Sequence, residues 1–159
     1  MKKFLYLLLA LPVLGLLASC DDDNSLPQVT VQVDYEGAVD VDGVLYVVQG
    51  EPFSITSVKV TPDEGTGNAT LGPVNYAWNS VFIGTSEVAP YGVGFDTENM
   101  NLGNHLLEMS ATIVQVNKPL STLNLGFKIK VVASAEDIPG NGDDTVEGGS
   151  IVTTVNTAH

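Results

Sequence analysis

The sequence predicts an all-β protein, an antiparallel β-sandwich of about seven strands. Short stretches in which apolar and polar side chains alternate recur along the chain, and this period of two is typical of half-buried strands. Loops rich in glycine, proline and asparagine separate these stretches. No window after the first twenty residues has the 3.6-residue repeat of an amphipathic helix, so little or no helix is expected.

Seven strands follow from the alternation, in chain order: Gln28–Tyr35, Val44–Val48, Phe53–Val60, Val74–Trp78, Val81–Thr85, Leu106–Val116 and Thr122–Val132. The apolar parity changes within the third, which predicts a β-bulge near Ser57. We expect irregular loops at Thr61–Pro73 and Ala89–Gly103. Ser150–Val155 could add a final edge strand.

The first residues have the pattern of an export signal. Lys2 and Lys3 precede the apolar run Phe4–Leu17, and small residues follow it. A permanent membrane helix needs about 20 apolar residues, so this run is too short. Leu17-Ala18-Ser19-Cys20 resembles the lipobox of bacterial lipoproteins, which implies cleavage after residue 19 and a lipid on the Cys20 thiol. A buried free cysteine is the alternative, but strongly polar residues follow at once.

Asp21, Asp22 and Asp23 follow Cys20 directly. This acidic run resembles the export signal that sends lipoproteins of bacteroidete-type bacteria to the outer face of the outer membrane. Residues 20–27 would then be a lipidated tether holding the protein at the cell surface. The alternative is a general polar tether, which would leave the protein on the periplasmic face.

Composition limits the possible partners. The 159 residues carry a net charge of −13, and all six basic residues are lysines. Loss of Lys2 and Lys3 with the signal would change the net charge to −15. Such a protein repels phosphate backbones, so nucleic-acid binding is excluded. We expect one domain at residues 28–133, and a flexible spacer with the possible edge strand at 134–159.

Three short motifs resemble those of bacterial immunoglobulin-like domains. They are the turn at Val47–Pro52, the aromatic strand and hairpin at Tyr76–Gly84, and the Leu102-Gly103-Asn104-His105-Leu106 approach to a late strand. The resemblance implies an immunoglobulin-like sandwich that lacks the disulfide of antibody domains, because Cys20 is the only cysteine. Sandwiches of this type serve many roles, so the fold implies no activity.

Catalysis is not expected. The histidines are His105 and the C-terminal His159, and no Gly-x-Ser-x-Gly elbow is present. We expect His105 to hydrogen-bond to the neighbouring Gly-Asn turn. A small hydrolase is only a remote alternative.

Sugar binding is the sharpest functional hypothesis. Aromatic rings can stack on the apolar faces of sugars, and amides and carboxylates can bond their hydroxyl groups. The candidate residues are Trp78, Asn79, Tyr91, Phe95 and Asp96. Trp78 is in phase with Val74 and Tyr76, so a core position is the competing interpretation for it.

Two further sites are weaker candidates. Asp40-Val41-Asp42-Gly43 has the spacing that begins a calcium loop, so Asp34, Glu36, Asp40 and Asp42 could bind calcium. A solvated turn is the alternative, and no other cofactor is indicated. Asp144-Thr145-Val146 resembles the O-glycosylation motif of bacteroidete-type bacteria, with Thr145 as the acceptor.

The sequence therefore indicates a non-enzymatic, membrane-anchored surface lipoprotein that acts as a binding module. Its most concrete form is glycan capture beside an outer-membrane uptake system, by analogy with similar lipoproteins. The alternative is a protein-interaction, adhesin or structural subunit of the cell envelope that uses an exposed sheet edge.

Overall fold

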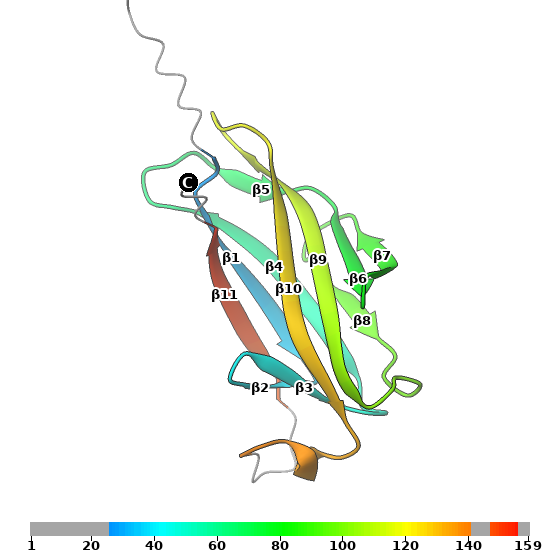
Figure 1. Cartoon of the computed structure of the whole chain (residues 1–159). Helices are drawn as coiled ribbons and strands as arrows, with labels where there is room; N and C mark the ends of the chain where they lie inside the picture. The colour runs from blue at the N-terminus through cyan, green and yellow to red at the C-terminus, as the bar shows by residue number, and fades with distance from the viewer. Residues whose placement is uncertain (1–25, 141–146, 156–159) are drawn as a thin grey trace, which may run out of the picture.

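The computed structural model describes residues 26–140 and 147–155, which form two packed β-sheets (Figure 1). The elements are β1 (Val29–Glu36), β2 (Val39–Val41), β3 (Val44–Val48), β4 (Phe53–Pro62), β5 (Ala69–Leu71), β6 (Val74–Trp78), β7 (Val81–Ser86), β8 (Val93–Phe95), β9 (Gly103–Gln115), β10 (Ser121–Val132), the 3₁₀ turn η1 (Ala135–Asp137) and β11 (Gly149–Val155).

The strand order is that of an immunoglobulin-like sandwich. One sheet has the order β11-β1-β4-β8, and the other has the order β2-β3-β10-β9-β6-β7, with β5 beside β9. The neighbours β6, β9 and β10 correspond to strands C, F and G of immunoglobulin domains, and β4 and β8 to strands B and E. The predicted all-β sandwich is confirmed.

Two details differ from the prediction. The described residues form eleven strands, whereas the sequence predicted about seven and one possible edge strand. The three strands that were not predicted, β2, β5 and β8, have three residues each. Strands so short show no alternation, and β5 and β8 lie inside the segments expected to be loops. The sandwich is also not wholly antiparallel, since β3 and β10 pair in parallel. The chain crosses from β1 to β3 and back to β4, which places β3 beside a strand running the same way.

The core lies between the sheets and consists of the inward side chains that the alternation predicts. Val29, Val31 and Val33 of β1 are at most 1% exposed, and Leu107, Met109 and Ile113 of β9 are equally buried. Leu123, Phe127, Ile129 and Val131 of β10 complete this layer.

The predicted bulge in β4 is present. Asp34 pairs with Ser57, but the next residue, Tyr35, pairs with Ile55, so Thr56 has no partner on β1. The extra residue shifts the inward-facing positions of β4 by one, so that Phe53 and Ile55 before it and Val58 after it are all buried in the core.

The predicted terminal edge strand is also present. β11 pairs with β1 from Val29↔Val155 to Tyr35↔Gly149. Ile138, which follows β10 in the chain, is buried against Val48 and Val132. The sandwich therefore continues beyond residue 133, where the sequence predicted that a spacer begins.

Asp34 joins three strands of the smaller sheet. Its Oδ1 accepts hydrogen bonds from Gln32 Nε2 (2.7 Å) and Ser150 Oγ (2.9 Å). Its Oδ2 accepts from Ser57 Oγ (2.6 Å) and Lys59 Nζ (2.9 Å). These bonds, that from Gln32 foremost, hold the pKa of the Asp34 carboxyl well below its ordinary value.

This network predicts an acid-dependent loss of stability. Because the pKa of Asp34 is lower in the folded than in the unfolded chain, its contribution is present above about pH 4 and is lost as the pH falls through the folded value. Asp34→Asn should lower the free energy of unfolding at pH 7 and flatten its fall between pH 5 and pH 2. Denaturant unfolding across this range measures both effects.

Asp63→Asn is the matched control, because the Asp63 carboxylate makes no hydrogen bond with the described residues. If Asp34→Asn lost stability on acidification as steeply as the unaltered chain, the assigned network would be contradicted.

Candidate functional site

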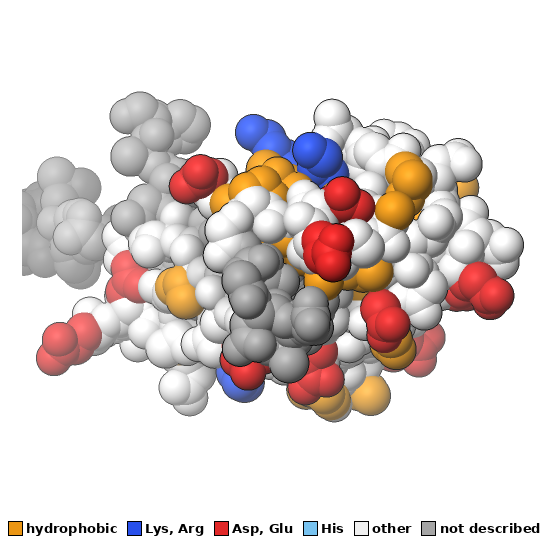
Figure 2. All heavy atoms as spheres, turned by 90° about the horizontal axis from the view of Figure 1, so that it is seen from below, with side chains coloured by type: hydrophobic (Ala, Val, Ile, Leu, Met, Phe, Trp, Pro, Cys, Tyr) orange, Lys and Arg blue, Asp and Glu red, His pale blue; other side chains and the backbone are white. Residues whose placement is uncertain are grey.

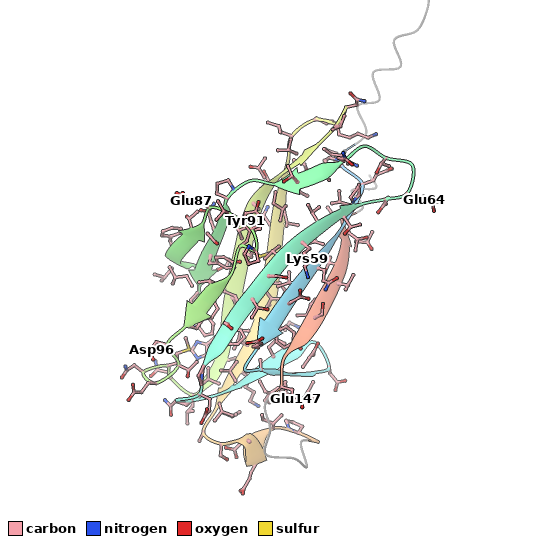
Figure 3. All side chains as sticks on the ribbon, turned by 180° about the vertical axis from the view of Figure 1, so that it is seen from behind. Lys59, Glu64, Glu87, Tyr91, Asp96 and Glu147 are labelled. Carbon is pink, nitrogen blue, oxygen red and sulfur yellow. The ribbon has the colours of Figure 1, made fainter. Side chains whose placement is uncertain are left out.

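An open cleft of about 450 Å³ lies at one end of the sandwich. The β6–β7 hairpin, β8 and the loop before β9 form its walls. We call it the aromatic cleft, and its lining residues are Trp78, Asn79, Ile83, Gly94, Phe95, Asp96, Asn99, Met100, Asn101 and His105. Asp96 marks this end in Figure 3, far from the end where the described chain begins.

A row of rings connects the core to the cleft. Phe53, which is 2% exposed, stacks on Phe95 with ring centroids 5.0 Å apart. Phe95 contacts Trp78 at 5.5 Å, and Trp78 contacts His105 at 5.3 Å. Trp78 is half-buried and packs against the core, so it belongs to both the core and the cleft.

His105 is held in one tautomer. Its Nε2 lies 2.7 Å from the Asn101 carbonyl oxygen, which can only accept, so Nε2 carries the proton. Its Nδ1 accepts from the Trp78 indole N–H (3.2 Å) and faces the Asn79 amide nitrogen (3.0 Å). His105 thus bonds to the turn before it, as the sequence predicted, and also fixes Trp78.

The Asn79-Ser80 turn is pinned to β9. Both residues have positive φ, 49° and 65°, as in the type I′ turns of tight hairpins. Asn79 N–H donates to the Leu106 carbonyl (2.8 Å), and Leu106 N–H donates to Asn79 Oδ1 (2.9 Å). Ser80 N–H donates to Glu108 Oε2 (2.7 Å).

The rim of the cleft offers hydrogen-bonding groups that the fold leaves free. The side-chain amides of Asn99 and Asn101 make no hydrogen bond with the described residues, and Asp96 accepts only from Glu98 N–H (3.1 Å). A Cβ on Gly94 would meet no atom within 4 Å, so the space at Gly94 is open. No lysine lines the cleft.

The structure brings together most of the residues that the sequence proposed for sugar binding. Trp78, Asn79, Phe95 and Asp96 all line the cleft. The sequence alone did not indicate Ile83, Gly94, Met100 or the free amides of Asn99 and Asn101. The run Asn99-Met100-Asn101, shortly after Asp96, was the signal that could have identified these amides.

Tyr91 is not part of the cleft, which corrects its prediction as an exposed ligand-binding residue. Its hydroxyl donates to the Leu71 carbonyl (2.8 Å), and its own carbonyl accepts from the Tyr76 hydroxyl. Tyr91 therefore packs against the core, and Figure 3 shows it well away from Asp96. Burial raises the pKa of the Tyr76 phenol far above its ordinary value, which keeps that hydroxyl protonated as a donor.

The predicted calcium site is not formed. In residues 26–140 and 147–155 no group of three or more metal-ligating side chains comes together, so Asp34, Glu36, Asp40 and Asp42 do not converge. Asp34 is used by the strand network described above. Asp40 instead accepts from Gly43 N–H (2.9 Å) and closes the turn between β2 and β3, the solvated-turn alternative.

Two further observations concern the histidine and the helices of the described residues. His105 is the one histidine among them, and structural hydrogen bonds use both of its ring nitrogens. No helix in this part of the chain could cross a membrane, since it holds only the three-residue turn η1. Cys20, Asp21, Asp22, Asp23, Thr145 and His159 lie outside the described residues.

Comparisons with known proteins add little. No family model and no curated protein matches the chain. Among solved structures it is similar to fibronectin(III)-like modules of CbhA from Clostridium thermocellum, with 21% identity and a TM-score of 0.36. The match covers 64% of this chain and 94% of that chain. The fold assignment therefore stands on the strand order.

Substitutions in the hairpin turn should act in opposite directions. Ser80→Gly removes the Cβ that strains the left-handed backbone conformation of this residue. Glycine also loses more backbone entropy on folding, so the net increase in the free energy of unfolding should be roughly 0.5 kcal/mol. Asn79→Ala places alanine in a left-handed backbone conformation and removes the hydrogen bond that Leu106 N–H donates to Asn79 Oδ1. It should lower the free energy of unfolding by about 2 kcal/mol. Chemical denaturation of both variants measures the difference, and two changes of the same sign would contradict the assigned geometry.

Proposed function

We propose that the chain is a bacterial surface lipoprotein whose immunoglobulin-like domain binds a neutral saccharide in the aromatic cleft. The observation that carries this proposal is the composition of the cleft. Trp78 and Phe95 supply apolar ring surface, Asn99 and Asn101 supply free amides, and Asp96 supplies a carboxylate acceptor, all at one open site.

The chemistry of the lining favours uncharged sugars. Ring faces contact the C–H surface of a pyranose, and amides can both donate to and accept from its hydroxyl groups. An anionic glycan would need a cation, whereas the cleft has Asp96 and no lysine. Figure 2 views the sandwich from below and shows both acidic side chains and lysines spread over it. The net charge of −13 would repel sulfated or uronic-acid polymers.

The position of the cleft fits a protein anchored through its N-terminal end. Gln28 N–H donates to Gln115 Oε1 (3.0 Å), so the described chain enters beside the end of β9. His105 lies near the start of β9, ten residues earlier, which corresponds to roughly 33 Å along the strand. The cleft and the point where the described chain begins are thus at opposite ends of the sandwich (Figure 1).

The anchor itself is proposed from the sequence. A lipid on Cys20 would hold the mature chain at a membrane, since several acyl chains bind far more stably than one. Asp21, Asp22 and Asp23 would direct it outward, where a cleft facing away from the membrane could meet extracellular glycans. Capture of these glycans for an outer-membrane uptake system is the role that this arrangement suits best.

A second candidate function, binding of an envelope protein, is favoured by the edge strand β7. Within residues 26–140 and 147–155, β7 pairs only with β6. Val81 and Phe82 on it are 66% and 65% exposed. An uncovered edge with large apolar side chains can accept an added strand from a partner.

Removing the free amides tests the saccharide site. The double variant Asn99→Ala/Asn101→Ala should keep its melting temperature, because neither amide is bonded to the described chain. Each lost neutral hydrogen bond is worth about 1 kcal/mol, so we expect at least a tenfold weaker binding of neutral oligosaccharides. A glycan array followed by isothermal titration of the purified protein measures this loss.

Asn68→Ala is the matched control, since Asn68 is an exposed asparagine in the loop before β5, far from the cleft. Equal affinity of the double variant and this control would refute the cleft as the site. Retention of an envelope protein in cross-linking on intact cells, with no sugar bound, would favour the second candidate.

Replacing Cys20 tests the anchor. Cys20→Ala removes the thiol that the lipid would modify, so the protein should move from the membrane fraction to the soluble fraction. Fractionation followed by immunoblotting measures the shift, and protease treatment of intact cells separately tests surface display. Continued membrane association of Cys20→Ala would overturn the lipid anchor.

A further inference from the structure

A second concave site lies on the outer face of the larger sheet. It is a groove of about 460 Å³ that crosses β10, β9, β6 and β7, which lie side by side in Figure 1. The β6–β7 hairpin separates it from the aromatic cleft, because Ser80 and Phe82 line the groove whereas Asn79 and Ile83 line the cleft.

The strand register arranges the outward side chains of this groove in two adjacent rows. One row is polar and consists of Asn124, Ser110 and Asn75. Thr85 continues this row on β7 but does not line the groove. The next row consists of Gly126, Glu108, Ala77 and Phe82. Gly126 and Ala77 have little or no side chain, so the second row is low on either side of Glu108, and Phe82 stands at its end. We call this low part of the groove the trough. The four strands, about 4.8 Å apart, span roughly 14 Å across this row.

Gly126 has no role that the fold itself requires. Its φ is not in the left-handed region. A Cβ at this position would make only an ordinary contact of 3.5 Å, with Leu106 Cδ1. Glycine in the interior of a strand weakens it and often marks the close approach of a ligand. Glycine at position 126 therefore lowers the stability of the strand, and no contact within the protein requires it.

The polar row is also largely unused by the fold. The Asn124 amide and the Ser110 hydroxyl make no hydrogen bond with the described residues. Asn75 Oδ1 accepts from Thr85 Oγ1 (2.6 Å), which leaves the Asn75 amide N–H groups free. Glu108 uses Oε2 for Ser80 N–H (2.7 Å) and has Oε1 available. These groups face the trough together with the ring of Phe82, which is 65% exposed.

From these observations we infer that the groove is a second saccharide site, whose floor is Gly126 and whose polar contacts are Asn124, Ser110 and Glu108. The sheet backbone is already paired here, so a ligand must be held by side chains alone. Amides, a hydroxyl, one carboxylate and one ring fit a neutral oligosaccharide lying along the trough. The inference extends the proposed saccharide function to a site that can be tested separately.

The experiment titrates the purified protein with neutral gluco-, xylo- and manno-oligosaccharides and follows its backbone amides by NMR. Binding in the groove should shift the amide signals of Ser110 and of Asn124–Gly126. Gly126→Thr, which fills the floor with a strand-favouring side chain, should weaken binding there at least tenfold while the melting temperature stays the same or rises. Asn124→Ala should weaken binding without changing the melting temperature.

Thr122→Val is the matched control, because Thr122 faces outward on the same strand beyond the groove. Unchanged affinity of Gly126→Thr and Asn124→Ala would overturn the groove. Loss of all binding in Asn99→Ala/Asn101→Ala would refute the groove and leave the cleft. Loss of all binding in Gly126→Thr would refute the cleft and leave the groove. Absence of binding by the unaltered protein would overturn both.

Discussion

Apolar packing between the two sheets is the constraint on which the rest of the structure depends. The chain has one cysteine, Cys20, ahead of the first strand, so no disulfide can join the sheets. Every inward position on β1, β9 and β10 must therefore contribute to the core, and a one-residue slip of any of these strands would expose its apolar side chains. The bulge at Thr56 serves the same requirement, since it keeps both halves of β4 packed inward.

This constraint explains which parts of the fold could be predicted. β3 and β6 have the bounds that the alternation predicts, and β1, β4, β7, β9 and β10 differ from it only at their ends. Half-buried strands need alternation, which is visible in the sequence. β5 and β8 have three residues each, too few to show a period. The parallel pairing of β3 with β10 depends on where the chain crosses between sheets, and no local pattern records that path.

The candidate sites were only partly predictable, for a related reason. Residue type indicated Trp78, Asn79, Phe95 and Asp96, but not that distant segments would bring them together. Tyr91 is also aromatic, yet the loop places it where its hydroxyl donates a hydrogen bond to the Leu71 carbonyl, away from the cleft. The groove could not be predicted at all, because the alignment of Gly126 with Glu108 and Ala77 arises from strand register alone.

The Asn79-Ser80 turn has a thermodynamic consequence for anything that binds beside it. Hydrogen bonds from Asn79 and Ser80 already fix the hairpin to β9, and His105 already fixes the Trp78 ring. A ligand on either side of this turn meets walls that are preorganised, so little conformational entropy remains to be lost on association. Such a surface can bind polar ligands that make few contacts. The small loss of conformational entropy then raises the affinity above what the contact area alone would give.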